Sequence, residues 1–289
     1  MTSGDAEVAL DAGALLAESP VWDGREGVLR WVDIPRGEVH RYDPSGGLDT
    51  HSAFGEPVGA VALREGGGLL LAVGRGFATV EQDGDALSWL WRAGRGDRMN
   101  DGKCDPAGRF WAGTMADERH PGGASLYRLD PDGHVEEALP AVTLSNGLGW
   151  SPSGETLYYV DTPLERVDAF DYDLSAGTIS RRRTLVDLRA ADGRPDGLTV
   201  DADGGLWVAM AHGGAVRRYT SDGVLDHVLT LPVPMVTSCT FGGPELADLY
   251  ITTASEEARH PGAVDHPHAG AVFRAALGVT GLPATPYRG

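Results

Sequence analysis

Six positions along the chain share one local setting, because each stands just before a short apolar stretch that ends in a turn. Two of them are carboxylates and two are amides. The positions are Glu18, Gly59, Asn100, Asn146, Asp196 and Ser238. Buried carboxylates need a counter-charge, and none of the six positions is a lysine or an arginine. A divalent cation bound by Glu18, Asn146 and Asp196 would supply that charge.

These three ligands offer only oxygen, which suits Ca²⁺, Mg²⁺ or Mn²⁺ and leaves Zn²⁺ or Fe²⁺ open. Three protein ligands also leave room for water and substrate, as a catalytic metal site requires. A second interpretation is that Asn146-Gly147 and Asp196-Gly197 are turns, since these dipeptides favour turns wherever they occur. Glu18 in the same setting favours the metal interpretation.

An internal repeat would bring these positions together. Each unit contains a turn, an apolar strand, a loop and a second strand. The apolar strands of the six units, which follow the six positions along the chain, lie at 27–33, 68–73, 108–114, 155–161, 205–209 and 248–252. The segments are short, rich in Val, Leu, Trp and Tyr, and separated by Asp-Gly and Ser-Gly turns, which is typical of strands and hairpins.

Repeats of about 40 to 50 residues that contain several strands are typical of propeller blades. We therefore predict an all-β fold, a six-bladed β-propeller whose four-stranded antiparallel blades surround a central channel, with residues 1–289 as one domain. A spare strand at 6–10 is expected to complete the last blade. The first strand of each blade lines the channel, so residues at the same phase meet on the axis. Trp31, Trp111 and Trp207 share a strand phase and are predicted to be blade core.

The composition excludes several function classes. The chain has 42 acidic and 24 basic side chains and a formal net charge of −18, which disfavours nucleic acid and anionic membranes as partners. It has no basic leader and no apolar run of spanning length, so a cytoplasmic location is expected. Cys104 and Cys239 form no metal or disulfide motif and are expected to be reduced and buried. No GxSxG, HExxH or P-loop motif is present.

Four motifs resemble those of the gluconolactonase, regucalcin and senescence-marker-protein family of six-bladed propellers, and the resemblance covers nearly the whole chain. They are Glu18-Ser-Pro-Val-Trp22, Arg98-Met-Asn-Asp-Gly-Lys103 with Trp111-Ala-Gly-Thr-Met115, Ser145-Asn-Gly-Leu148 with Trp150-Ser-Pro152, and Pro195-Asp-Gly-Leu-Thr-Val-Asp201. The resemblance implies that Glu18, Asn146 and Asp196 bind the metal. It also implies that Arg98, Asn100 and Glu118 face the substrate.

The activity implied by the resemblance is the opening of sugar lactones. The metal would polarise the lactone carbonyl and Asp196 would act as general base. Arg98, Asn100 and Glu118 would hold sugar hydroxyls. Non-functional alternatives remain: Arg98 could pair with Asp97 or Asp101, and Glu118 could be a solvated loop acid. Asp101 and Lys103, in an Asn-Asp-Gly-Lys turn, could support the site or form a common turn without function.

Two other functions fit the same site. A metal-dependent organophosphate hydrolase would use the cation on P=O instead of C=O. A calcium-binding regulatory protein would need no turnover at all. The expected partner is a small-molecule sugar lactone, and the chain is expected to be a monomer or a small homo-oligomer.

Overall fold

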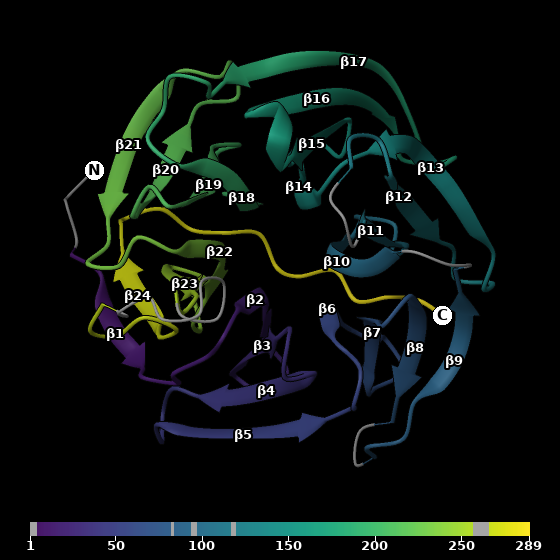
Figure 1. The fold of residues 1–289 in the computed structure, drawn as a ribbon, viewed down its shortest axis with the longest axis horizontal. Helices are drawn as coiled ribbons and strands as arrows, with labels where there is room; N and C mark the ends of the chain where they lie inside the picture. Colours follow the sequence, from purple (N-terminus) through teal and green to yellow (C-terminus); the bar gives the residue numbers. More distant parts are fainter. Residues whose placement is uncertain (1–4, 82–83, 94–96, 117–119, 257–265) are drawn as a thin grey trace.

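The computed structural model describes residues 5–81, 84–93, 97–116, 120–256 and 266–289. These residues form strands and loops, and the single helical element among them is one 3₁₀ turn, η1 (Thr162–Leu164). The 24 strands of the described chain form six four-stranded sheets. The sheets stand around a central axis as the blades of a propeller (Figure 1). The predicted six-bladed β-propeller is confirmed.

Each of the first five blades uses four consecutive strands, from an inner strand at the axis to an outer strand at the rim. These strands are β2 (Ala17–Asp23), β3 (Val28–Asp33), β4 (Glu38–Asp43) and β5 (Leu48–Ala53); β6 (Val58–Leu63), β7 (Leu69–Val73), β8 (Gly76–Val80) and β9 (Ser88–Arg92); β10 (Asp97–Cys104), β11 (Phe110–Ala116), β12 (Ala124–Leu129) and β13 (Val135–Val142); β14 (Ser145–Trp150), β15 (Thr156–Asp161), β16 (Arg166–Asp173) and β17 (Thr178–Asp187); β18 (Arg194–Val200), β19 (Leu206–Ala211), β20 (Ala215–Tyr219) and β21 (Leu225–Thr230).

The sixth blade joins the two ends of the chain. It contains β22 (Val236–Gly242), β23 (Asp248–Thr253), β24 (Val272–Ala276) and the N-terminal strand β1 (Glu7–Leu10). The strand β1 pairs antiparallel with β24, so the predicted spare strand does complete the last blade. This pairing closes the ring and leaves each blade with a single outer edge.

Apolar side chains between and within the blades form the core. Trp31, Trp111 and Trp207 are fully buried, as their repeated phase predicts. The indole of Trp111 donates to Asp105 over 3.1 Å, and that of Trp207 donates to Asp201 over 2.8 Å. Each aspartate also accepts backbone amides of the turn that precedes the strand. Turn and core are therefore held by the same buried carboxylate in these two blades.

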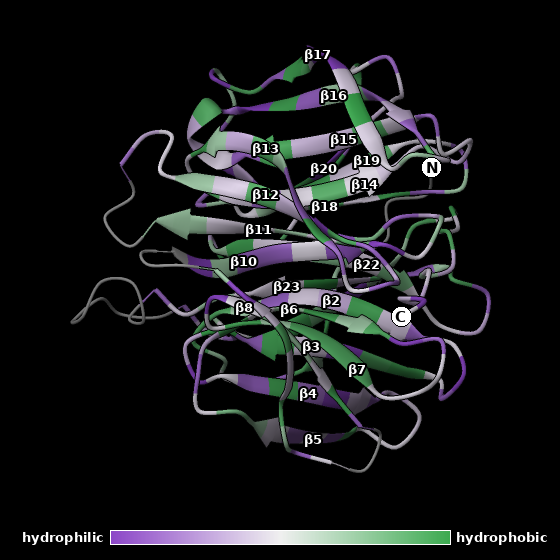
Figure 2. Cartoon of the chain, turned by 90° about the vertical axis from the view of Figure 1, so that its right-hand side faces the viewer, coloured by the Kyte–Doolittle hydropathy of each residue, from purple (hydrophilic) through white to green (hydrophobic). Residues whose placement is uncertain are grey.

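Figure 2 shows this arrangement from the side, with hydrophobic colour along strands such as β7 and hydrophilic colour on many connecting loops. Cys104 and Cys239 are both free and buried, as predicted. No helix among the described residues has the length and apolar character needed to cross a bilayer.

The C-terminal segment crosses one end of the channel (Figure 1, yellow). Gly281 pairs with Asp201 of the fifth blade, and Tyr287 pairs with Arg64 of the second. Tyr287 is buried, and its hydroxyl donates to the carbonyl of Asp130 over 2.9 Å. This segment therefore forms a floor to the channel.

Candidate metal and substrate site

Every inner strand has a register shift close to its start. The shifts lie between Glu18 and Val21, Val58 and Ala60, Met99 and Gly102, Ser145 and Leu148, Pro195 and Leu198, and Val236 and Ser238. A bulge of this kind releases a side chain from the regular pleat and aims it elsewhere. The predicted site positions therefore lie inside the inner strands at these bulges, and the expectation that they precede the strands is wrong.

In the sixth blade the register departs from the prediction. Ser238 pairs with Thr252, and Thr237 is the residue at the shift. The Thr237 hydroxyl donates over 2.5 Å to the carbonyl of Ala17, the residue that precedes Glu18. Thr237 thus ties the last inner strand to the first.

The glycines after Asn146 and Asp196 serve close packing of inner strands. A Cβ on Gly147 would lie 2.6 Å from the carbonyl oxygen of Asp196, and one on Gly197 would lie 2.5 Å from the Cβ of Ser238. Both glycines lie within strands, β14 and β18. The turn interpretation of these two dipeptides is therefore wrong, because glycine is needed here for close approach of neighbouring strands.

A directional chain of hydrogen bonds connects the third, fourth and fifth blades. Arg98 Nη1 donates to Asn100 Oδ1 over 3.0 Å, and Asn100 Nδ2 donates to Asn146 Oδ1 over 3.0 Å. Asn146 Nδ2 then donates to the Thr162 hydroxyl over 2.7 Å. That hydroxyl donates over 2.8 Å to the carbonyl of Pro195, the residue that precedes Asp196. The chain fixes which way both amides point.

Further contacts hold Asn100 and the start of β14. The second amide hydrogen of Asn100 is donated to the Ser145 carbonyl over 2.7 Å. The Tyr159 hydroxyl donates to the Ser145 side chain over 2.8 Å. Burial raises the pKa of Tyr159, so this phenol keeps the proton that it donates. The residue before Asn146 is thus fixed from two sides.

The donor set suits a hard divalent cation. Glu18, Asn146 and Asp196 are each about nine-tenths buried or more, with 4%, 4% and 5% of their surface exposed. Glu18 accepts the amide hydrogen of Ser19 over 2.7 Å, and Ser19 takes a positive φ of 46° at this bulge. Asn146 Oδ1 accepts one hydrogen bond and retains a second lone pair. Carboxylate oxygens on β2 and β18 and an oriented amide oxygen on β14 are the ligand types that such an ion prefers.

No three His, Cys, Asp or Glu side chains converge as a metal site in the described part of the chain. An oxygen site at the axis therefore needs the Asn146 amide as its third protein donor. The ligand set predicted from the sequence contains two carboxylates and this amide, and it stays a prediction.

The two predicted substrate residues that the structure describes lie next to this donor set. Asn100 is buried, and Arg98 is half-buried with its guanidinium also donating to the Met99 carbonyl over 2.9 Å. Glu118 lies outside the described residues. Asp101 and Lys103 lie within β10, so their assignment to a turn is wrong.

Comparison with known proteins agrees with this architecture. Residues 16–255 match the model of the SMP-30/gluconolactonase/LRE-like region. The chain belongs to this family. Regucalcin of Bos taurus is 40% identical over 299 residues, and the match covers 100% of both chains.

Two solved structures show how closely the fold is shared. A luciferin-regenerating enzyme superposes with a TM-score of 0.92 at 31% identity, covering 99% of each chain. A calcium-binding protein, regucalcin, from Agrobacterium tumefaciens superposes with a TM-score of 0.91 at 27% identity, covering 99% of this chain and 98% of that one. The family and its propeller are thus shown by both sequence and structure.

Within this family member, sequence reasoning missed two residues that position the site. Thr162 connects Asn146 to the strand that carries Asp196, and Thr237 anchors the strand that carries Glu18. Thr162 stands in η1 between strands, where no repeat or motif marks it. Thr237 carries no such mark either, because the repeat does not fix the register of the sixth inner strand.

Proposed function

We propose that the chain is a divalent-metal-dependent hydrolase that opens sugar lactones of the aldonolactone class. The observation that carries the proposal is the hydrogen-bonded connection between Arg98, Asn100 and Asn146, which joins a substrate clamp to a buried oxygen donor set. A protein that only stores an ion needs no such clamp.

Glu18, Asn146 and Asp196 would hold the cation. When bound, this ion would act as a Lewis acid on the lactone carbonyl. Asp196 would accept the proton of the attacking water through a carboxylate oxygen, as a general base does. Its place at the bulge of β18 supports this role, because a bulge can re-aim a side chain.

Arg98 and Asn100 would bind the sugar. The Arg98 guanidinium has five N–H donors, of which Nη1 is used by Met99 and Asn100. The planar guanidinium fork of N–H donors is a group that suits the hydroxyls and ring oxygen of an aldonolactone. We propose Glu118 as a third contact to the sugar, as the family resemblance implies.

Calcium binding is a second candidate, favoured by the similarity to the calcium-binding protein of Agrobacterium tumefaciens. Oxygen-only ligands are compatible with Ca²⁺, which makes this ion one of the metals to test. Organophosphate hydrolysis would use the same donor set. A panel of lactone and phosphotriester substrates separates the three functions.

The test is Asp196→Ala with Asp203→Ala as the matched control. Asp203 is an exposed aspartate in the turn after the end of β18, whereas Asp196 lies near the start of that strand. We expect Asp196→Ala to abolish proton release from aldonolactones while circular dichroism and the unfolding midpoint stay those of a folded propeller. The control should keep wild-type turnover. Wild-type turnover in folded Asp196→Ala would contradict the proposed base and ligand.

A further inference from the structure

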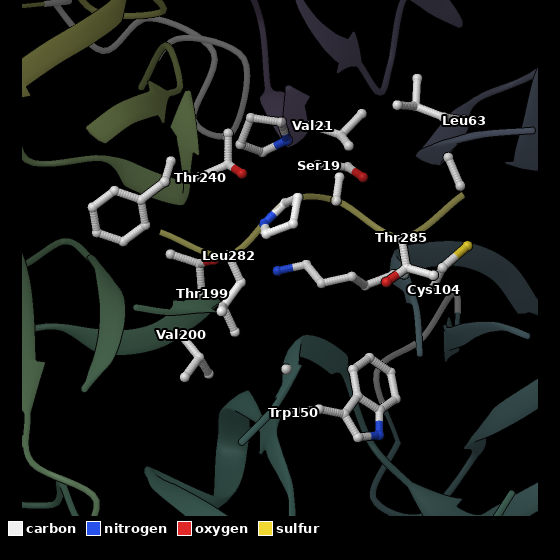
Figure 3. A pocket seen from close by; sticks show the side chains of 18 of the residues that line it. Ser19, Val21, Leu63, Cys104, Trp150, Thr199, Val200, Thr240, Leu282 and Thr285 are labelled. Atoms are coloured by element: carbon white, nitrogen blue, oxygen red, sulfur yellow. The ribbon is translucent and has the colours of Figure 1, made fainter. Parts of the chain in front are cut away.

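Between the donor set and the floor, the channel contains a cavity of about 280 Å³. Figure 3 shows its wall, with Ser19, Thr199 and Thr240 among apolar side chains such as Val21 and Trp150. Residues Leu282 and Thr285 of the C-terminal segment close it from the other side. Of the described lining residues, only Asp101 and Lys103 carry a charge.

Lys103 crosses this cavity from one blade to another. It starts on β10 of the third blade, and its Nζ donates to the Leu198 carbonyl on β18 of the fifth blade over 2.8 Å. Leu198 is the first residue after the bulge that carries Asp196. The ammonium therefore lies beside β18, the strand that carries the proposed ligand Asp196.

Two carboxylates act electrostatically on this ammonium. Burial lowers the pKa of Lys103, and the charges of Asp101 and Glu18 act in the opposite direction. Burial also raises the pKa of Asp101, against the effect of Lys103 and of the Gly102 amide that Asp101 accepts over 2.7 Å. Asp101 is buried and Lys103 is half-buried, each acts electrostatically on the other, and Glu18 also acts on Lys103.

Four described groups set the charge that the proposal considers. When all of them are ionised, Glu18, Asp101 and Asp196 contribute three negative charges, and the Lys103 ammonium contributes one positive charge. The two negative charges that remain equal the charge of one divalent cation. A cation fixed near the donor set also repels any metal ion bound there.

We propose that Lys103 is a fixed internal cation of the channel, which compensates the carboxylates from below and lowers the affinity of the site for its divalent ion. The proposal rests on the proposed metal site and adds a residue that sets the affinity of this site for its ion. Lys103 is a positioning and tuning residue, because nothing places it in contact with substrate.

The alternative is that Lys103 only supports β18 through the Leu198 carbonyl. The two roles predict opposite changes in metal affinity when Lys103 is replaced. Loss of a support would disorder the strand and weaken metal binding, whereas loss of a repelling charge would strengthen it. Metal affinity, which needs no substrate, therefore distinguishes them.

The experiment compares Lys103→Met with Lys103→Arg, which keeps the charge, and Thr240→Val, which removes polarity from the same cavity without changing charge. Calorimetric titration of chelated protein with CaCl₂ and with MnCl₂ gives the affinity and the number of ions. We expect Lys103→Met to bind about tenfold more tightly, a change of about 1.4 kcal/mol. The other two variants should bind like the wild type. Equal or weaker binding by Lys103→Met would overturn the proposal.

A second arm works without metal. Urea unfolding of the chelated wild type, Asp101→Asn, Lys103→Met and the double variant forms a double-mutant cycle. Each single variant leaves one buried charge uncompensated, so the double variant should have a higher urea midpoint than the sum of the single shifts predicts. Additive shifts would overturn the role of Lys103. A wild type that binds no divalent ion would refute the proposed function, and this cycle would still decide on Lys103.

Discussion

Replacing Gly147 by alanine should disable the site through packing alone. The added Cβ would lie 2.6 Å from the Asp196 carbonyl oxygen, also clashing with the Leu198 amide nitrogen, whereas ordinary contact begins at 3.4 Å. Because these neighbours are backbone atoms, β14 and β18 have to move apart. Gly147 has no positive φ, so the effect is steric and does not arise from backbone strain.

The expected size follows from this displacement. Overpacking of this kind costs about 1–3 kcal/mol of unfolding free energy. A displacement of roughly 1 Å between reacting groups costs about 10²-fold in rate. We therefore expect Gly147→Ala to remain folded, with lactone turnover about 10²-fold lower and weaker metal binding.

Gly149→Ala is the matched control. Its Cβ would lie 3.0 Å from Leu198 Cδ1 and 3.1 Å from Val200 Cγ2, and both atoms are ends of flexible side chains. The same substitution two residues along the same strand should therefore leave turnover within a few-fold of the wild type. Steady-state kinetics and metal titration of both variants are the assay. Equal losses in the two variants, or none in Gly147→Ala, would refute the reasoning.

Three further predictions concern the clamp, the ligand support and the blade core. Arg98→Ala should raise KM more than it weakens metal binding; equal losses in kinetics and in calorimetric metal titration would place Arg98 in structural support. Thr162→Val leaves Asn146 Nδ2 without its acceptor and should weaken metal binding by about 10–100-fold; unchanged affinity in the same titration would contradict the hydrogen-bonded chain. Asp201→Ala leaves the Arg218 guanidinium and the Trp207 indole without their shared acceptor, so it should lower the free energy of unfolding by about 3–5 kcal/mol. Urea unfolding beside the exposed Asp203→Ala variant measures this, and equal midpoints would refute it.

Most of the fold could be predicted because its information is local and repeated. Each blade carries its own turn and apolar strand, so six weak copies reinforce one another. The buried Trp31, Trp111 and Trp207 follow from that phase. The strand β1 was recognisable because it was left over after six units were counted, and ring closure needs one more strand.

The details of the site depend on contacts between blades, which a repeat does not encode. The bulges arise from pairing with the next strand, so the shift from Ser238 to Thr237 was out of reach of a pattern of apolar residues. The close approach at Gly147 involves a strand about fifty residues away in the next blade. Thr162 likewise acts across a blade boundary. The floor formed by the C-terminal segment has no counterpart in the repeat.

The measurement that tests the central claim most directly is proton release from a panel of aldonolactones. Chelated protein is refilled with Ca²⁺, Mg²⁺, Mn²⁺, Zn²⁺ or Fe²⁺ in turn, with spontaneous hydrolysis subtracted and a phosphotriester run in parallel. The account predicts that at least one metal restores turnover of at least one aldonolactone in the wild type and none does so in Asp196→Ala. Hydrolysis no faster than the spontaneous rate with every pair of metal and lactone would contradict it.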